Sequence, residues 1–132
     1  MNILRALLIA LCTGMALAQP APPLAQWVDA ELVTVQLVDD RFLPDKLTFR
    51  RGVLYRLRLE NKGKEMHEFT APEFLAAIEV KNSDVLEPGL PEILLHPTER
   101  KDLYFVARQS GHYPLRCADH DWDGMVGEID VQ

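Results

Sequence analysis

Apolar residues recur at every second position in several segments between residues 33 and 131. The clearest segment starts at Val53, and its Tyr55, Leu57 and Leu59 alternate with charged side chains. A period of two is typical of β-strands that bury one face, whereas an amphipathic helix repeats near 3.6 residues. Short segments at intervals of roughly ten residues, joined by glycine and proline turns, predict about seven strands in an all-β, Greek-key β-sandwich. The intervals are too short for the crossover helices of a βαβ fold.

Two stretches depart from this alternation. Residues 71–91 contain several prolines and have mixed polarity, and residues 74–80 are compatible with either a short helix or an irregular sheet edge. Residues 118–124 are expected to form the loop between the last two strands.

The N-terminus has the pattern of a cleaved export signal. Arg5 precedes an apolar run, and Ala-Leu-Ala at residues 16–18 is a small-x-small cleavage sequence. The run is shorter than the roughly 20 residues that cross a bilayer. A lipid anchor at Cys12 is an alternative that the bulky residue before it disfavours. We therefore predict a signal peptide at residues 1–18, a periplasmic location, a flexible leader at residues 19–29 and one domain at residues 30–132.

Acidic residues outnumber basic ones, 20 against 14, which gives a formal net charge of −6. This balance lacks the basic footprint of a nucleic-acid-binding protein. No segment after the signal approaches the length of a membrane span. We therefore expect a monomer that binds no nucleic acid, does not insert into a membrane and meets a partner with a basic surface.

Removal of the signal would take Cys12 with it and leave Cys117 as the single thiol. A disulfide within the chain would then be impossible. An unpaired cysteine in an exported protein is usually explained by an intermolecular bond, a reactive thiol or a metal-bound thiolate.

The last loop and its two ends carry three residues with metal-binding side chains, in the order Cys-x-x-His-x-x-x-x-Met: Cys117, His120 and Met125. They offer a thiolate, an imidazole and a thioether, which are three of the four donors of a blue-copper site. The second histidine must come from elsewhere, and His67, on a short strand predicted at residues 66–70, is the candidate. Because His67 is distant in sequence, the folded sandwich rather than the metal would fix the geometry.

Each of these residues also has an ordinary structural interpretation. A lone cysteine is most often a small buried hydrophobe, Met125 alone would be a core side chain, and His67 alone a core or edge histidine. Their combination with an export signal favours the metal site. His96 and His112 fall in predicted turns and are expected at the surface, and Met66 points away from His67 in an extended strand.

A wider set of positions extends this pattern. They are Phe42-Leu43-Pro44, Leu47-Thr48-Phe49, Arg51-Gly52, Leu59-Glu60-Asn61, His67, Gly111-His112-Tyr113, Cys117, His120, Met125 and Gly127. In their order and spacing they resemble the plastocyanin and azurin family of cupredoxins. The resemblance implies one copper ion, held by His67, Cys117 and His120 in a trigonal plane and by Met125 as a long axial ligand. With one cysteine in the loop, the binuclear copper centre of some relatives is excluded.

Two features depart from the family pattern. Glu68 follows His67 where these proteins more often carry asparagine or an apolar residue, and its carboxylate is expected to alter hydrogen bonding around the site. The loop is acidic where many relatives have an apolar docking patch, and Trp122 would supply the remaining apolar contact. Three aspartates of this loop are expected to steer a cationic partner: Asp119, Asp121 and Asp123.

The predicted function is that of an electron carrier and not an enzyme, with one copper cycling between Cu(I) and Cu(II) during brief contacts with redox partners. Copper storage or delivery without electron transfer is the alternative: the same ligands would serve it and the acidic loop favours it, although histidine-rich or methionine-rich tracts are absent. An enzyme with Cys117 as nucleophile and His120 as base lacks a third, orienting group. Zinc would leave Met125 without a role.

Overall fold

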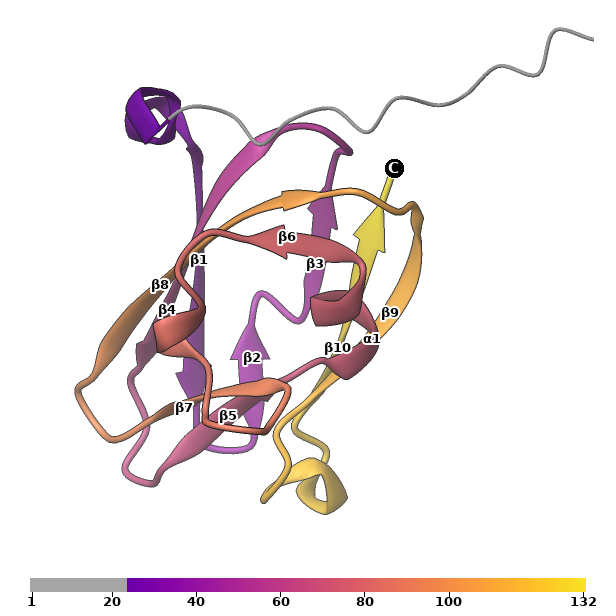
Figure 1. The fold of residues 1–132 in the computed structure, drawn as a ribbon. Helices are drawn as coiled ribbons and strands as arrows, with labels where there is room; N and C mark the ends of the chain where they lie inside the picture. The colour runs from indigo at the N-terminus through magenta and orange to yellow at the C-terminus, as the bar shows by residue number, and fades with distance from the viewer. Residues whose placement is uncertain (1–23) are drawn as a thin grey trace, which may run out of the picture.

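The computed structural model describes residues 24–132, so the predicted signal at residues 1–18 and the first part of the predicted leader lie outside the described residues. Two five-stranded sheets form a sandwich (Figure 1). The first sheet has the order β2 (Arg41–Leu43), β1 (Glu31–Val38), β4 (Leu54–Asn61), β8 (Arg100–Ala107) and β6 (Ile78–Val80). The second has the order β3 (Lys46–Phe49), β10 (Val126–Val131), β9 (Gly111–Arg116), β5 (His67–Thr70) and β7 (Glu92–Leu95). The predicted β-sandwich is confirmed.

The strand connections cross between the two sheets. Strand β1 is parallel to β4, and β3 is parallel to β10, while the other pairs are antiparallel. Between β1 and β4 the chain passes through β3 of the opposite sheet, so β4 can return beside β1 in the same direction. Several strands beyond the expected seven are short: β2 and β6 have 3 residues each and β7 has 4. Such strands contain too few residues for a recognisable alternation.

The core lies between the sheets and is built from the alternating apolar positions. In β4, every second side chain is buried and the intervening ones are half-buried. Aromatic rings fill the centre, with centroid distances from 4.8 to 5.6 Å. These rings belong to Phe49, Tyr55, Phe74 and Phe105. Burial of each such side chain stabilises the fold by roughly 1.5–3 kcal/mol, which makes the sandwich a firm frame for the loops at its ends.

The structure differs from the expected domain boundary at residue 30. Residues Leu24–Asp29, inside the segment predicted as a flexible leader, form a 3-10 helix, η1. Trp27 packs edge-on against Tyr104, with ring centroids 6.1 Å apart, and the Lys81 ammonium lies 5.1 Å from the centre of its ring. This packing gives the end of the segment apolar and cation–π contacts with the first sheet, which the proline-rich composition did not indicate.

The stretch at residues 71–91 contains both of the structures that the sequence left open. Helix α1 (Pro72–Ala76) has proline in its first turn, where a missing N–H costs no helical hydrogen bond, and it buries Phe74. Strand β6 follows as the edge of the first sheet, and a 3-10 turn, η2 (Ser83–Val85), comes next. Within residues 24–132, no helix is both long and apolar enough to span a bilayer.

Loops from both sheets meet at the end of the sandwich that is lowest in Figure 1. Strand β5 begins there at His67, after the loop of residues 62–66. Strands β9 and β10 are joined there by residues 117–125, which include the 3-10 turn η3 (Asp121–Asp123). This end of the fold therefore receives all four residues that the sequence assigns to the metal.

Candidate metal centre

The loop of residues 117–125, called the ligand loop below, is folded by its own backbone. The Cys117 N–H donates to the Met125 carbonyl at 3.0 Å, and the Met125 N–H donates to the His120 carbonyl at 3.1 Å. The His120 N–H donates to the Cys117 carbonyl at 3.2 Å. Gly124 closes the turn with a φ of 91°, a left-handed conformation that glycine adopts without strain. The three ligands predicted in this loop are thus fixed relative to one another.

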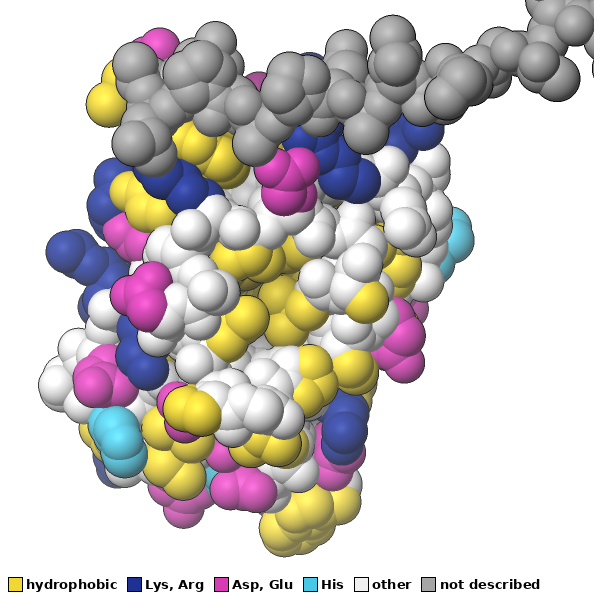
Figure 2. Space-filling view, in the orientation of Figure 1, with side chains coloured by type: hydrophobic (Ala, Val, Ile, Leu, Met, Phe, Trp, Pro, Cys, Tyr) yellow, Lys and Arg dark blue, Asp and Glu magenta, His cyan; other side chains and the backbone are white. Residues whose placement is uncertain are grey.

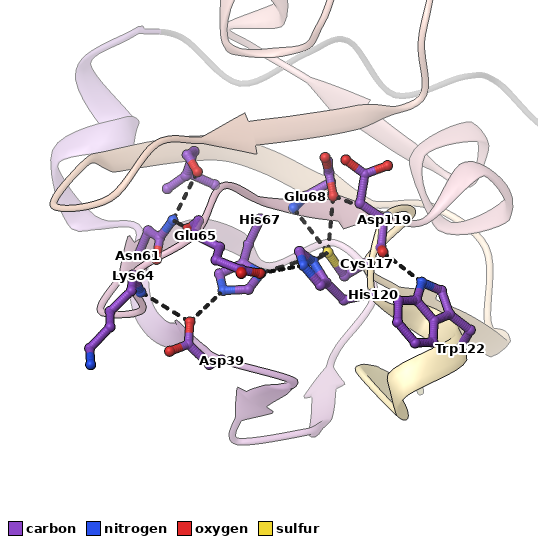
Figure 3. Close-up of polar contacts among 11 residues, drawn as sticks. Asp39, Asn61, Lys64, Glu65, His67, Glu68, Cys117, Asp119, His120 and Trp122 are labelled. Atoms are coloured by element: carbon purple, nitrogen blue, oxygen red, sulfur yellow. Dashed lines mark hydrogen bonds and ion pairs between the residues drawn. The ribbon is translucent and has the colours of Figure 1, made fainter.

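The structure brings His67, Cys117 and His120 together (Figure 3), with one ligand atom of each within 4.8 Å of the others. Both imidazoles place Nδ1 near the cysteine Sγ, at 3.9 Å for His67 and 3.5 Å for His120. A metal about 2.0 Å from each nitrogen and about 2.3 Å from sulfur, at angles of about 120°, requires nitrogen–sulfur separations of about 3.7 Å. Both nitrogen–sulfur separations are therefore close to what an ion requires, and a thiolate with two imidazoles is a donor set suited to copper.

Met125 is fully buried and belongs to the hydrophobic core. It lies directly before β10, and its backbone bonds to Cys117 and His120 keep it next to the ligand cluster. A buried thioether at this position satisfies the demands of core packing, and a thioether sulfur is a weak copper donor.

A family model described as a cupredoxin-like domain matches residues 6–131. The chain belongs to this family. Its fold is similar to that of auracyanin B, with 20% identity, a TM-score of 0.59, and coverage of 78% of this chain and 89% of that one. It is also similar to reduced auracyanin from the photosynthetic bacterium Roseiflexus castenholzii, with 17% identity, a TM-score of 0.59, and coverage of 78% and 98%. A search of curated proteins found no match.

In this cupredoxin, Glu68 contacts the cysteine sulfur, as its position beside His67 suggested. Its backbone N–H donates to Sγ at 3.4 Å, and its buried carboxylate lies 2.9 Å from Sγ and accepts the Asp119 N–H at 3.4 Å. Burial, and secondarily the Glu68 carboxylate that accepts the S–H hydrogen bond, raise the pKa of the Cys117 thiol to about 12. Without a metal, the sulfur of this cupredoxin is therefore a protonated thiol at neutral pH.

Both histidines that the sequence predicts as ligands of this cupredoxin have a carboxylate at the nitrogen that faces away from the sulfur. His67 Nε2 lies 3.3 Å from Asp39, and His120 Nε2 lies 2.7 Å from Glu65. The Lys64 N–H, with a smaller contribution from His67, holds the pKa of Asp39 below its usual 3.8 against partial desolvation. Sequence analysis missed Asp39 and Glu65, because single acidic residues in polar turns form no motif and show no periodicity.

The histidines and the tryptophan that the sequence places at the surface are exposed. His112 and His96 are exposed, and neither joins the ligand cluster among the described residues. Trp122 is 79% exposed, and its indole N–H donates to the Asp119 carbonyl at 2.9 Å. Figure 2 shows a hydrophobic protrusion at the end of the molecule where η3 lies, with acidic side chains beside it.

Proposed function

We propose that this cupredoxin is an exported, mononuclear copper protein that transfers single electrons between redox partners. The observation that carries this proposal is the arrangement of two imidazole Nδ1 atoms around one cysteine Sγ, within a cupredoxin-like domain. When bound, copper supplies a centre that passes between Cu(I) and Cu(II). His67, Cys117 and His120 would hold it, and Met125 would supply a weaker thioether donor.

The chain would keep its ligands in place in both oxidation states. His67 is the first residue of β5, and the ligand loop is fixed by its own backbone bonds. A frame of this kind limits rearrangement when the charge of the site changes, which favours fast electron transfer. His120 is 14% exposed and is the ligand we assign to electron entry and exit, whereas the side chains of His67 and Cys117 are buried.

The proposed partner is a redox protein with a basic surface, met briefly in the periplasm. Support for the charge comes from the aspartates of the ligand loop and from the net charge of −6. Exposed Trp122, among these aspartates, would provide an apolar contact at the centre of the encounter. Support for export comes from the predicted signal at residues 1–18.

A catalytic role for the thiol is disfavoured by its environment. Reactive cysteines have a low pKa and are partly exposed, whereas the Cys117 thiol is buried and its pKa is raised to about 12. We therefore propose a carrier that transforms no substrate.

The test is the visible absorption spectrum of the protein titrated with Cu(II). We expect one equivalent to produce an intense band at about 600 nm, from charge transfer between thiolate and copper. Cys117→Ser should abolish this band, and His112→Ala, which removes an exposed histidine outside the cluster, should leave it unchanged. A colourless complex, or a band that survives loss of Cys117, would contradict the proposal.

A second measurement separates electron transfer from copper storage. Voltammetry of the coloured protein should show a reversible one-electron couple with copper retained in both states. Tight copper binding without such a couple would instead support storage or delivery.

A further inference from the structure

The loop of residues 62–66 reaches over the ligand histidines and is fixed by two side chains beside it. The buried Asn61 amide donates to the carbonyls of Glu65 and Leu95 at 2.8 and 2.9 Å, and its Oδ1 accepts the Gly63 N–H at 2.9 Å. Asp39 accepts the Lys64 N–H at 3.0 Å. Backbone groups on both sides of residue 65 are therefore held by the domain.

Fixing this loop places the Glu65 carboxylate at the outer edge of His120 (Figure 3). Glu65 is 64% exposed, yet its Oε2 lies 2.7 Å from His120 Nε2. That separation is in the range of charge-assisted hydrogen bonds. The contact joins the loop before β5 to the ligand loop, which are 55 residues apart in sequence.

The contact also selects a tautomer of the imidazole. An ionised carboxylate only accepts hydrogen bonds, so the neutral ring must carry its hydrogen on Nε2 and leave a lone pair on Nδ1. Nδ1 is the atom that lies 3.5 Å from Cys117 Sγ. The bond from Glu65 therefore gives His120 both the orientation and the tautomer that metal binding requires.

The same arrangement is repeated more deeply at His67. Its Nε2 meets Asp39 at 3.3 Å, and Gly63 leaves the space for this pair, because a Cβ at residue 63 would lie 2.8 Å from that nitrogen. A carboxylate therefore contacts the Nε2 atom of each imidazole, on the side away from Cys117 Sγ.

We propose that Glu65 is a positioning residue of the metal centre, which holds His120 in its ligating tautomer and favours Cu(II) over Cu(I) through its negative charge. This inference rests on the proposed copper site. A carboxylate bonded to a ligating imidazole makes the imidazole a stronger donor, and such outer partners typically change metal affinity by about 10-fold to 100-fold. The more highly charged ion gains more from this donor, so Glu65 lowers the reduction potential.

The first test uses the protein without metal. In wild type, nitrogen-15 NMR of the histidine rings should show hydrogen on His120 Nε2 and none on Nδ1. Glu65→Ala should give a mixture of tautomers. Glu65→Gln, which loses the charge but keeps an acceptor oxygen, should retain the wild-type tautomer. This readout does not depend on copper, so it tests the positioning role even where the absorption test of the proposed function fails.

The second test uses the copper-loaded protein. Glu65→Ala should weaken Cu(II) binding by about 10-fold or more, with less effect on Cu(I). A 10-fold difference between the two effects corresponds to a potential about 59 mV higher. Asp123→Asn is the charge-matched comparison, because it removes one carboxylate from the ligand loop, in η3, and the histidine contacts shown there involve Glu65 and Asp39 instead.

Two results would overturn the proposal. One is an unchanged His120 tautomer in Glu65→Ala. The other is a shift in copper affinity and potential no larger than that of Asp123→Asn, which would reduce the effect of Glu65 to general surface charge. The melting temperature of each variant without metal, expected to stay near that of wild type because Glu65 is exposed, controls for loss of folding.

Discussion

Cys117 should be an unusually unreactive thiol in the protein without metal, and replacement of Glu68 should activate it. The pKa of the thiol is raised from 9.0 to about 12, first by burial and then by the Glu68 carboxylate. Three pH units correspond to a thousandfold smaller thiolate fraction at neutral pH. Glu68→Gln removes the charge beside Sγ and leaves the burial. We therefore expect about 10-fold to 100-fold more thiolate at pH 8, short of the full thousandfold.

The assay is the rate of alkylation by iodoacetamide, followed by mass spectrometry of the peptide that contains Cys117. For a pKa near 12, the wild-type rate should rise about 10-fold per pH unit, without levelling between pH 8 and pH 10. An ordinary thiol with a pKa of 9.0 would level off within this range. His112→Ala, which removes an exposed side chain paired with Asp130 rather than with the sulfur, serves as the control for both rate and slope.

The same pKa determines how copper binding depends on pH. The folded-state pKa is raised, so the thiol form persists through neutral pH and copper must displace its proton. The apparent affinity for copper should therefore continue to increase as the pH rises well above 9, because each pH unit leaves fewer thiols to be deprotonated. A wild-type alkylation profile that levels near pH 9, or a Glu68→Gln rate equal to wild type, would refute the reasoning about burial and the carboxylate.

Three further predictions concern the partner surface, the axial ligand and the fold. Reduced protein should react with hexaammineruthenium(III), a cationic oxidant, faster at low salt than at high salt, because salt screens the attraction between the oxidant and the acidic loop. Neutralising the three aspartates of the ligand loop should remove that advantage at low salt, while Glu73→Gln with Glu128→Gln should not. Met125→Leu should cost less than about 1.5 kcal/mol of stability, because the volume is conserved, and should raise the copper potential; an unchanged potential would show that Met125 only packs. Burial alone would raise the pKa of Asp102, but hydrogen bonds from Arg58 and Arg56 outweigh it and lower the pKa below 3.8. The stability from these pairs is present above the ordinary pKa and is lost as pH falls through the lowered one. Asp102→Asn should therefore reduce stability by about 1 kcal/mol at pH 7, after allowance for solvent screening, and thermal unfolding should show a smaller difference at pH 2.

Much of the fold was predictable because its longest strands bury one face. Strand β4, one of the strands of 8 residues, buries every second side chain, and β10 buries Ile129 and Val131, which are two positions apart. The short strands β2 and β6 were not predictable, since 3 residues cannot show a period. Helix η1 was missed for a different reason. Its formation accompanies the packing of Trp27 on Tyr104, a contact between residues distant in sequence.

The same distinction between local and distant contacts applies to the site. The ligand loop holds three predicted ligands within nine positions, so their order alone indicated copper chemistry. His67 was first a candidate on a separate predicted strand, and the resemblance to a family pattern gave it the same role. Glu68 was noticed because it departs from that pattern. Asp39 and Glu65 correspond to no position in that family pattern. Their contacts with the histidines form only when turns between different strands meet.

Carboxylates meet the ligands of this cupredoxin in two different ways, and the difference has a consequence for metal binding. Asp39 and Glu65 bond to nitrogens that face away from the sulfur, so their contacts can persist when the site is filled. Glu68 instead accepts a bond from the atom that must lose its proton. Once Cys117 is a thiolate, this carboxylate and the sulfur can no longer share a hydrogen bond from the thiol, and 2.9 Å is a short separation for two anions. The histidine side of the site is therefore prepared for the metal in advance, whereas the sulfur side must rearrange around Glu68. We therefore expect the rearrangement around Glu68 to limit the rate of metal uptake. Uptake should be faster in Glu68→Gln.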